Sequence, residues 1–173
     1  EPVDAVFICT PNNLHAEYAL KCLRAGKHVF VEKPLALTVA DGVEMVRTAA
    51  EHDRLLMSGQ TLRFSPRIRQ MKQLLAEGCV GEVRHIVHRR MSPGRGGDES
   101  SWFARQAASG GILPGIGSHS LDAILWWLED RAATVYAVVR NIDPHPDVDI
   151  EDEASLVATT TGGVLINVAF SFH

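Results

Sequence analysis

Three short apolar runs, each followed by a polar turn, alternate with helical segments in the first part of the chain. The runs cover residues 5–9, 29–31 and 55–57 and are rich in β-branched and large apolar side chains. Such runs are typical of strands buried on both faces, and strands that are joined through helices lie parallel. We therefore expect residues 1–62 to form the C-terminal half of a Rossmann-type, doubly wound parallel sheet.

Capping signals place the helices between these runs. Asn12 or Asn13 is expected to cap the first helix, because short polar side chains accept hydrogen bonds from the free N–H groups of a first turn. Gly26 is expected to end that helix, since glycine readily adopts the left-handed conformation found there. Thr38 and Asp41 have the spacing of a capping box and predict the start of the second helix.

After residue 62 the alternation gives way to a pattern dominated by strands. The predicted strands cover residues 83–90, 135–139, 154–159 and 164–172. Apolar side chains at helical spacing predict helices over residues 66–77 and 118–128. The dipeptide Gly162-Gly163 is typical of a hairpin turn, which makes the strands beside it antiparallel. Residues 63–173 are therefore expected to form the first part of an α+β domain with a mostly antiparallel sheet.

Composition and charge narrow the possible functions. With 46% hydrophobic and 22% charged residues, the 173-residue chain has the composition of an ordinary globular protein. Its formal net charge of −4 argues against a nucleic-acid partner, because phosphate binding requires a basic surface. Arg89, Arg90 and Arg95 form a local basic cluster, which we interpret as a solvated loop.

The sequence also argues against membrane and metal binding. No apolar run approaches the length of a membrane span, and no basic-then-apolar leader opens the chain, so we expect a cytoplasmic location. Cys9, Cys22 and Cys79 are odd in number and lack the spacing of metal ligands. We expect them to be reduced, structural thiols and expect no metal site.

Two motifs indicate chemistry when they are taken together. Glu32-Lys33-Pro34 ends the second apolar run, and the stretch from Gly117 to Asp122 contains His119. A lysine at a strand end is usually a solvated charge, and a histidine near a helix start is usually a cap or a surface residue. Ligands of parallel sheets, however, bind at the carboxyl ends of the strands, where Lys33 is expected to lie.

The order and spacing of four motifs resemble those of the Gfo/Idh/MocA family. The motifs are the segment from Val6 to His15, Glu32-Lys33-Pro34, Arg63-Phe64-Ser65-Pro66 and the stretch that contains His119. The resemblance spans most of the chain and implies a nicotinamide-dependent oxidoreductase that acts on a sugar, cyclitol or related polyol. The reaction implied is hydride transfer between NAD or NADP and a secondary alcohol.

The resemblance also implies roles for individual residues. Lys33 would contact the substrate hydroxyl and help its proton to leave. His119 would act as the base, because imidazole titrates near neutral pH. Asp122 shares a helix face with His119 and would orient the imidazole or bind a substrate hydroxyl, although it could also be an ordinary helix-face carboxylate.

Further residues are expected around the cofactor and substrate. The expected cofactor-binding residues are Thr10, Pro11, Asn12, His15, Glu32, Lys33 and Gln60. A capped turn explains the first four equally well. Arg63 is placed near the cofactor or the substrate. Trp102, in the long glycine- and serine-rich stretch over residues 92–111, could line a sugar site or belong to the core.

Two departures from the family pattern leave an alternative open. The chain has no glycine-rich phosphate turn after a strand, and we reject Gly115-Ile116-Gly117 for that role because Pro114 interrupts any strand before it. We therefore expect a middle fragment of a longer protein. Gly115 also occupies the place of a family aspartate, which favours as the alternative a catalytically silent regulator that binds nucleotide or sugar.

The last predicted strand suggests the protein's partners. Its alternating apolar face over residues 164–172 would need a cover, and the sheet of the family commonly packs against that of a second subunit. We expect a homo-oligomer that forms through the C-terminal sheet, with a small sugar or polyol as substrate.

Overall fold

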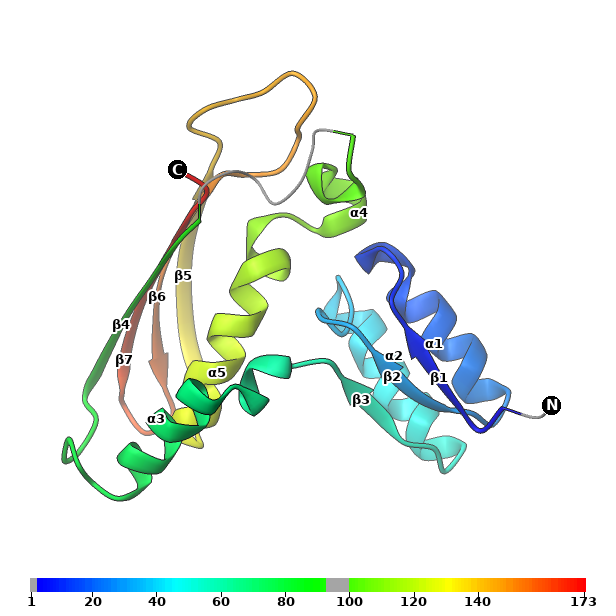
Figure 1. Cartoon of the computed structure of the whole chain (residues 1–173), viewed down its shortest axis with the longest axis horizontal. Helices are drawn as coiled ribbons and strands as arrows, with labels where there is room; N and C mark the ends of the chain where they lie inside the picture. The colour runs from blue at the N-terminus through cyan, green and yellow to red at the C-terminus, as the bar shows by residue number, and fades with distance from the viewer. Residues whose placement is uncertain (1–2, 93–99) are drawn as a thin grey trace.

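The computed structural model describes residues 3–92 and 100–173, which form two units, each built around its own sheet (Figure 1). The first unit contains β1 (Ala5–Ile8), η1 (Asn12–Leu14), α1 (His15–Arg24), β2 (His28–Val31), α2 (Val39–Glu51) and β3 (Leu56–Ser58). Its strands are all parallel and lie in the order β1-β2-β3. The expected half of a doubly wound sheet is thus confirmed.

Both helices of the first unit pack on the same face of its sheet (Figure 1). The core between them includes Leu23, Val31 and Met45, none of which is exposed to solvent. The opposite face carries Phe7, Phe30 and Met57, which are register partners across the three strands. Phe7 and Met57 are exposed there.

The predicted caps have different outcomes. The Thr38 hydroxyl accepts a hydrogen bond from the Asp41 N–H at 3.0 Å, which confirms the start of α2. Gly26 has a φ of 74° just after α1 and confirms its end. The predicted asparagine cap of α1 is wrong, because no side chain caps η1 or α1. The Asn12 side-chain amide instead donates to the Ser109 carbonyl of the second unit at 2.8 Å.

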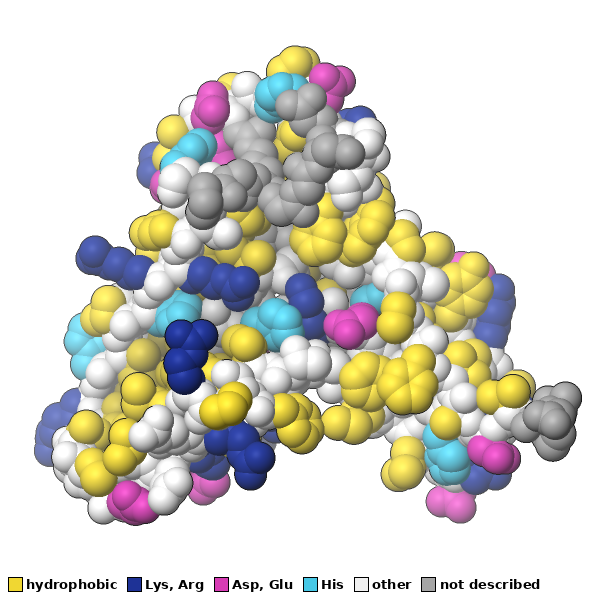
Figure 2. All heavy atoms as spheres, viewed as in Figure 1, with side chains coloured by type: hydrophobic (Ala, Val, Ile, Leu, Met, Phe, Trp, Pro, Cys, Tyr) yellow, Lys and Arg dark blue, Asp and Glu magenta, His cyan; other side chains and the backbone are white. Residues whose placement is uncertain are grey.

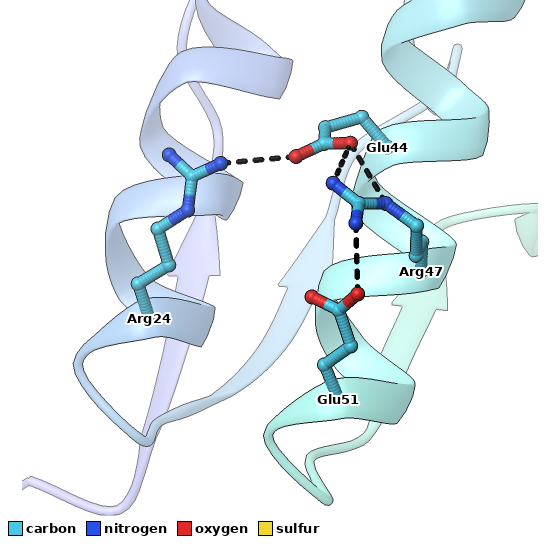
Figure 3. Close-up of polar contacts among 4 residues, drawn as sticks. All are labelled: Arg24, Glu44, Arg47 and Glu51. Carbon is cyan, nitrogen blue, oxygen red and sulfur yellow. Dashed lines mark hydrogen bonds and ion pairs between the residues drawn. The ribbon is translucent and has the colours of Figure 1, made fainter.

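An exposed network of ion pairs joins α1 to α2 (Figure 3). Glu44 accepts from Arg24 at 3.0 Å and from Arg47 at 2.6 Å, and Arg47 also donates to Glu51 at 2.8 Å. The Arg47 guanidinium lowers the pKa of the Glu44 carboxyl. Exposed pairs such as these contribute little stability one by one.

The second unit follows a short connection and is built on a four-stranded mixed sheet. Its elements are η2 (Thr61–Phe64), α3 (Pro66–Ala76), β4 (His85–Met91), η3 (Trp102–Ala104), α4 (Gln106–Ser109), η4 (Leu113–Gly117), α5 (Ser118–Leu128), β5 (Ala132–Arg140), β6 (Glu153–Thr160) and β7 (Leu165–Ser171). The strand order is β4-β7-β6-β5, with β4 parallel to β7 and the other pairs antiparallel. The expected α+β arrangement with a mostly antiparallel sheet is confirmed.

Helix α5 covers one face of the second sheet and leaves the other open (Figure 1). The covered face contributes Leu156, Ile166, Val168 and Phe170 to a core that also includes Ile124 of α5. The open face and the edge strand β5 expose several large apolar side chains, namely Val87, Met91, Val135, Tyr136, Val138, Val139, Val157 and Leu165.

The basic cluster was expected to form a solvated loop, and this expectation is wrong. Arg89 and Arg90 both lie in β4, and Arg95 lies outside the described residues. Exposure alternates along β4, so Arg89 points to solvent while Arg90 is partly buried on the covered face together with Ile86 and His88. The strand predicted over residues 83–90 already included Arg89 and Arg90, and the loop interpretation overlooked this overlap.

The cysteines Cys9, Cys22 and Cys79 are free thiols, as expected. Over residues 3–92 and 100–173, no helix combines the length and the apolar character that crossing a membrane requires.

Candidate active site at the junction of the two units

The Lys33 side chain crosses from the first unit to the second. It follows β2 at the carboxyl edge of the parallel sheet, and its ammonium donates to the carbonyl oxygen of Gly115 at 2.6 Å. Gly115 lies in η4, a π-helical turn that leads directly into α5. The ammonium also lies 5.9 Å from the centre of the Phe103 ring, a favourable distance for a cation–π contact.

His119 lies in the first turn of α5, four residues after the glycine that Lys33 contacts. Its Nδ1 atom is buried and has no hydrogen-bond partner among the described residues. Burial lowers the pKa of His119, and the charges of Lys33 and Arg90 lower it further, while Glu32 and Asp122 oppose them. The imidazole is therefore neutral at neutral pH, which is the form that can accept a proton.

The pKa of Lys33 is also lowered, mainly by burial, with a contribution from Arg90 that Glu32 opposes. A partly desolvated ammonium interacts more strongly with a hydroxyl oxygen than one in bulk water does. Glu32 accepts a hydrogen bond from the backbone N–H of Lys33 at 3.2 Å, so that this carboxylate lies at the turn that carries the lysine.

Asp122 pairs with Arg63 in this structure. The Arg63 guanidinium donates two hydrogen bonds to the carboxylate, at 2.8 and 2.6 Å, and it also lies 5.9 Å from the centre of the Trp126 ring. The structure therefore brings together two residues that were expected to bind substrate. The Asp122 carboxylate therefore does not bind the Nδ1 atom of His119 in this structure.

Buried polar atoms without partners mark the carboxyl edge of the parallel sheet. They are Thr10 Oγ1 after β1, Ser58 Oγ at the end of β3 and Gln60 Oε1 just beyond it, and none has a partner in the described part of the chain. Buried polar groups are normally satisfied, so this row of atoms fits a polar ligand at the edge. The nicotinamide end of a dinucleotide fits such an edge.

Asn12 and His15 lie deeper than expected of residues that touch a cofactor. Both are buried, and Asn12 binds Ser109, as described above. The two ring nitrogens of His15 lie 2.7 Å from the Pro34 carbonyl oxygen and 3.0 Å from that of Thr10. His15 thus connects the turn after β1 to the turn that carries Lys33. Pro11 is partly buried at the start of η1, between these two contacts.

Phe103 is the aromatic side chain that lies at Lys33. Trp102, the residue singled out from the sequence, packs against Phe103 with ring centres 4.5 Å apart. A Cβ atom added at Gly115 would lie 3.5 Å from the Phe103 ring, so this ring lines the turn that Lys33 contacts. The sequence held no signal that favoured one of these neighbouring aromatic residues over the other.

Arg90 is a site residue that the sequence interpretation missed. Its charge lowers the pKa of Lys33, of His119 and of its neighbour His88, where burial is the larger cause. The alternation of β4, which places residues 86, 88 and 90 on the covered face, was the signal that could have found it.

The glycines of the second motif serve packing. Gly115 and Gly117 lie inside a helical turn, and a Cβ atom on Gly117 would lie 3.3 Å from the Phe170 ring. Gly110 and Gly111 have φ angles of 82° and 91°, which favour glycine. This geometry agrees with rejecting Gly115-Ile116-Gly117 as a phosphate-binding turn, because such a turn follows a strand.

Two protein-family descriptions match the chain. "Oxidoreductase family, NAD-binding Rossmann fold" matches residues 1–60, and "GFO/IDH/MocA C-terminal domain" matches residues 68–173. Together they cover both units.

Individual relatives agree with these families. A 1,5-anhydro-D-fructose reductase from Ensifer adhaerens is 38% identical over 142 residues, which cover 79% of this chain and 41% of the relative. An inositol 2-dehydrogenase from Saccharopolyspora erythraea is 31% identical over 169 residues, or 96% of this chain and 47% of the relative. The chain thus spans about half the length of these curated relatives.

Solved structures show the same architecture. The aldose-aldose oxidoreductase from Caulobacter crescentus, complexed with glycerol, matches with a TM-score of 0.90 and 32% sequence identity. The match covers 98% of this chain and 51% of that protein.

Proposed function

This chain belongs to the Gfo/Idh/MocA family of oxidoreductases, and from that premise we propose that it transfers hydride between its cofactor and a secondary alcohol of a sugar, cyclitol or related polyol. The family is an NAD-binding one, so the cofactor is NAD or NADP. The names of the relatives, a reductase and a dehydrogenase of sugar-like compounds, support this class of substrate.

In the proposed reaction, Lys33 and His119 act on the same hydroxyl group. When bound, the nicotinamide supplies the acceptor or donor of the hydride. The Lys33 ammonium donates a hydrogen bond to the substrate oxygen and stabilises negative charge on it. The neutral His119 imidazole takes the hydroxyl proton during oxidation and returns it during reduction.

The observation that carries the proposal is the contact of the Lys33 ammonium with the Gly115 carbonyl. This contact holds a cation of the first unit beside the turn that leads to His119 on the second unit. The orphaned atoms of Thr10, Ser58 and Gln60 support a cofactor at the adjacent sheet edge. We assign Thr10, Pro11, Glu32 and Gln60 to contacts there, and Asn12 and His15 to holding the turns that make them.

The test is a screen of polyols and sugars with the intact protein, in which reduction of NAD and of NADP is followed by absorbance. Turnover of at least one compound is expected, together with its loss in the Lys33→Met protein. Tight cofactor binding by calorimetry without turnover of any compound would contradict the proposal. It would favour the silent regulator, for which Gly115 at the place of a family aspartate is the supporting feature.

We also propose that the protein forms a homo-oligomer through the open face of the second sheet. The exposed apolar side chains of that face, among them Val87, Tyr136 and Val157, support this proposal because such patches on soluble proteins commonly mark interfaces. Sedimentation analysis of the intact protein and of a Val157→Lys variant tests it. A monomeric wild-type protein would contradict it.

A further inference from the structure

Strand β4 directs an arginine toward the candidate active site. Arg90 is the register partner of Phe170 on the neighbouring strand β7, and both point to the face that α5 covers. The Phe170 ring in turn lies against Gly117, where an added Cβ atom would be 3.3 Å from it. Phe170 thus links Arg90 to the η4 turn, whose Gly115 carbonyl accepts the hydrogen bond of Lys33.

Among the described residues, the charged groups that act on His119 are more positive than negative. Lys33 and Arg90 both act electrostatically on His119. Asp122 also acts on His119, but both of its carboxylate oxygens bind Arg63, so this pair is neutral. Within residues 3–92 and 100–173, Glu32 is the other carboxylate that acts on His119. Figure 2 shows Lys or Arg and His side chains, with an Asp or Glu side chain beside them, where the two units meet.

A second donor lies on the same row of β4. The Nε2 atom of His88 is buried and has no partner within the described residues, and its ring lies 6.1 Å from that of Phe170. His88 and Arg90 are two residues apart in one strand and therefore point to the same face. An unpaired imidazole nitrogen next to a guanidinium is well suited to an acidic oxygen, which can accept hydrogen bonds from both groups.

We propose that the substrate of this protein is an anionic sugar, in which a carboxylate or a phosphate ester binds Arg90 and His88 while an alcohol carbon of the same molecule faces Lys33 and His119. This inference rests on the proposed function. None of the described residues forms an ion pair with Arg90, so a neutral sugar would leave its partly buried guanidinium without a counter-charge from this part of the chain, which is unfavourable. An acidic substituent supplies that charge, and the guanidinium binds it with two parallel hydrogen bonds.

The test compares a neutral hexose with its two acidic derivatives on the intact protein in the presence of NAD or NADP. For each of the glucose, galactose and mannose series, calorimetry measures binding of the neutral hexose, the hexuronate and the hexose 6-phosphate. At least one anionic probe is expected to bind about 10-fold or more tightly than its neutral hexose. The hexuronate and 6-phosphate arms distinguish the two kinds of acid. Absence of binding by every anionic probe would overturn the proposal.

Substitutions then assign the effect to Arg90. Arg90→Gln is expected to weaken binding of the preferred anion by about 10- to 100-fold and so to remove most of its advantage over the neutral hexose. Arg90→Lys, which keeps the charge, is expected to retain part of the preference and serves if the glutamine variant fails to fold. Arg84→Gln is the control, because Arg84 is exposed just before β4 and pairs with Glu82.

The outcomes separate this inference from the proposed function. Anion binding that depends on Arg90, without reduction of the cofactor, would keep the anionic site and contradict the oxidoreductase. Turnover of a neutral hexose without binding of any anionic probe would keep the oxidoreductase and overturn the anionic site. Equal affinity of the Arg90→Gln and wild-type proteins for the anion would also overturn it.

Discussion

The Arg63 guanidinium donates two hydrogen bonds to the Asp122 carboxylate and so fastens the connection between the two sheets to helix α5. The pair spans 59 residues of sequence. Its side chains are 43% and 17% exposed, which places the pair at the edge of the junction. Solvent screening limits its effect on stability, while the two parallel hydrogen bonds fix its geometry.

We expect Arg63→Lys to lower the free energy of unfolding by about 0.5–1 kcal/mol, because lysine keeps the charge but cannot make the two-pronged contact. Urea denaturation of the intact protein measures the change. Arg67→Lys is the matched control, since Arg67 is exposed on α3 and forms no ion pair within the described ranges. Equal effects of the two substitutions would show that the geometry of the pair is unimportant.

Lys33→Met should reduce kcat by about 10²- to 10⁴-fold, since it removes the proposed proton-transfer assistance but keeps an unbranched side chain only one atom shorter. The loss of stability should be near 1 kcal/mol, the value of the single hydrogen bond to the Gly115 carbonyl. Steady-state kinetics and urea denaturation are compared on the same preparation. If folding and activity are lost together, Lys33 is a structural residue.

The pH dependence of kcat/KM for alcohol oxidation should report His119. Since only the neutral imidazole accepts a proton, activity falls as pH drops through its pKa. Burial, Lys33 and Arg90 lower that pKa, so the acid limb should lie below the ordinary histidine value of about 6.5. Arg90→Gln removes one cause and should move the limb to higher pH, whereas Arg84→Gln should not. An acid limb at the same pH in the Arg90→Gln and wild-type proteins would contradict this assignment.

Gly110→Ala should destabilise the protein more than Gly78→Ala does. Both glycines have left-handed φ angles, 82° and 71°, and this conformation alone costs an alanine about 1 kcal/mol. A Cβ atom at Gly78 would meet nothing within 4 Å, but one at Gly110 would lie 2.5 Å from Leu37 of the other unit. Thermal and urea denaturation of the two variants isolate this extra packing cost. Equal losses of stability in the two variants would mean that Leu37 moves to make room for the added methyl group.

Asp130 should make the stability of the β6–β7 turn dependent on pH. Hydrogen bonds from the Thr160 and Thr161 hydroxyls, and from the Gly162 and Arg131 N–H groups, hold the pKa of its carboxyl well below the usual range. Because the folded pKa is depressed, the stabilisation is present above the unfolded value of about 3.9 and is lost as pH falls below it.

The test of this turn is Asp130→Asn. This variant should be less stable than the wild type at neutral pH, and the gap should begin to narrow as the pH falls below about 3.9 and close only as the pH approaches the depressed folded pKa. The free energy of unfolding of both proteins is measured at a series of pH values. If the difference in stability between the two proteins stays constant across this pH range, the effect comes from the altered hydrogen bonds and not from the charge of the carboxylate.

Much of the fold was predictable because its signals are local. The apolar runs, the Thr38 cap and the glycine at the end of α1 each act within a few residues. Helix α5 was predicted over residues 118–128 and occupies that range. Lys33 was accessible as a candidate because a parallel sheet places its ligands at strand ends, and its position there follows from the order of elements alone.

The parts that were missed depend on contacts across the two units. Asn12 has the residue type of a helix cap, but in the folded chain its side-chain amide donates to the Ser109 carbonyl, 97 residues away. Arg90 lies in a strand that was predicted, but which face of that strand is covered depends on α5, which is distant in sequence. Phe103 lies beside Gly115, while its neighbour Trp102 was the residue singled out, and the sequence does not show which of the two rings points there. The contacts of Asn12 and Phe103 have no local sequence pattern.

The lysine of one unit is oriented by a backbone carbonyl of the other, and this has a kinetic consequence. Separation of the units would withdraw the ammonium from its acceptor. In the proposed mechanism the catalytic arrangement therefore exists only while the two units are in contact, and separating them would stop turnover.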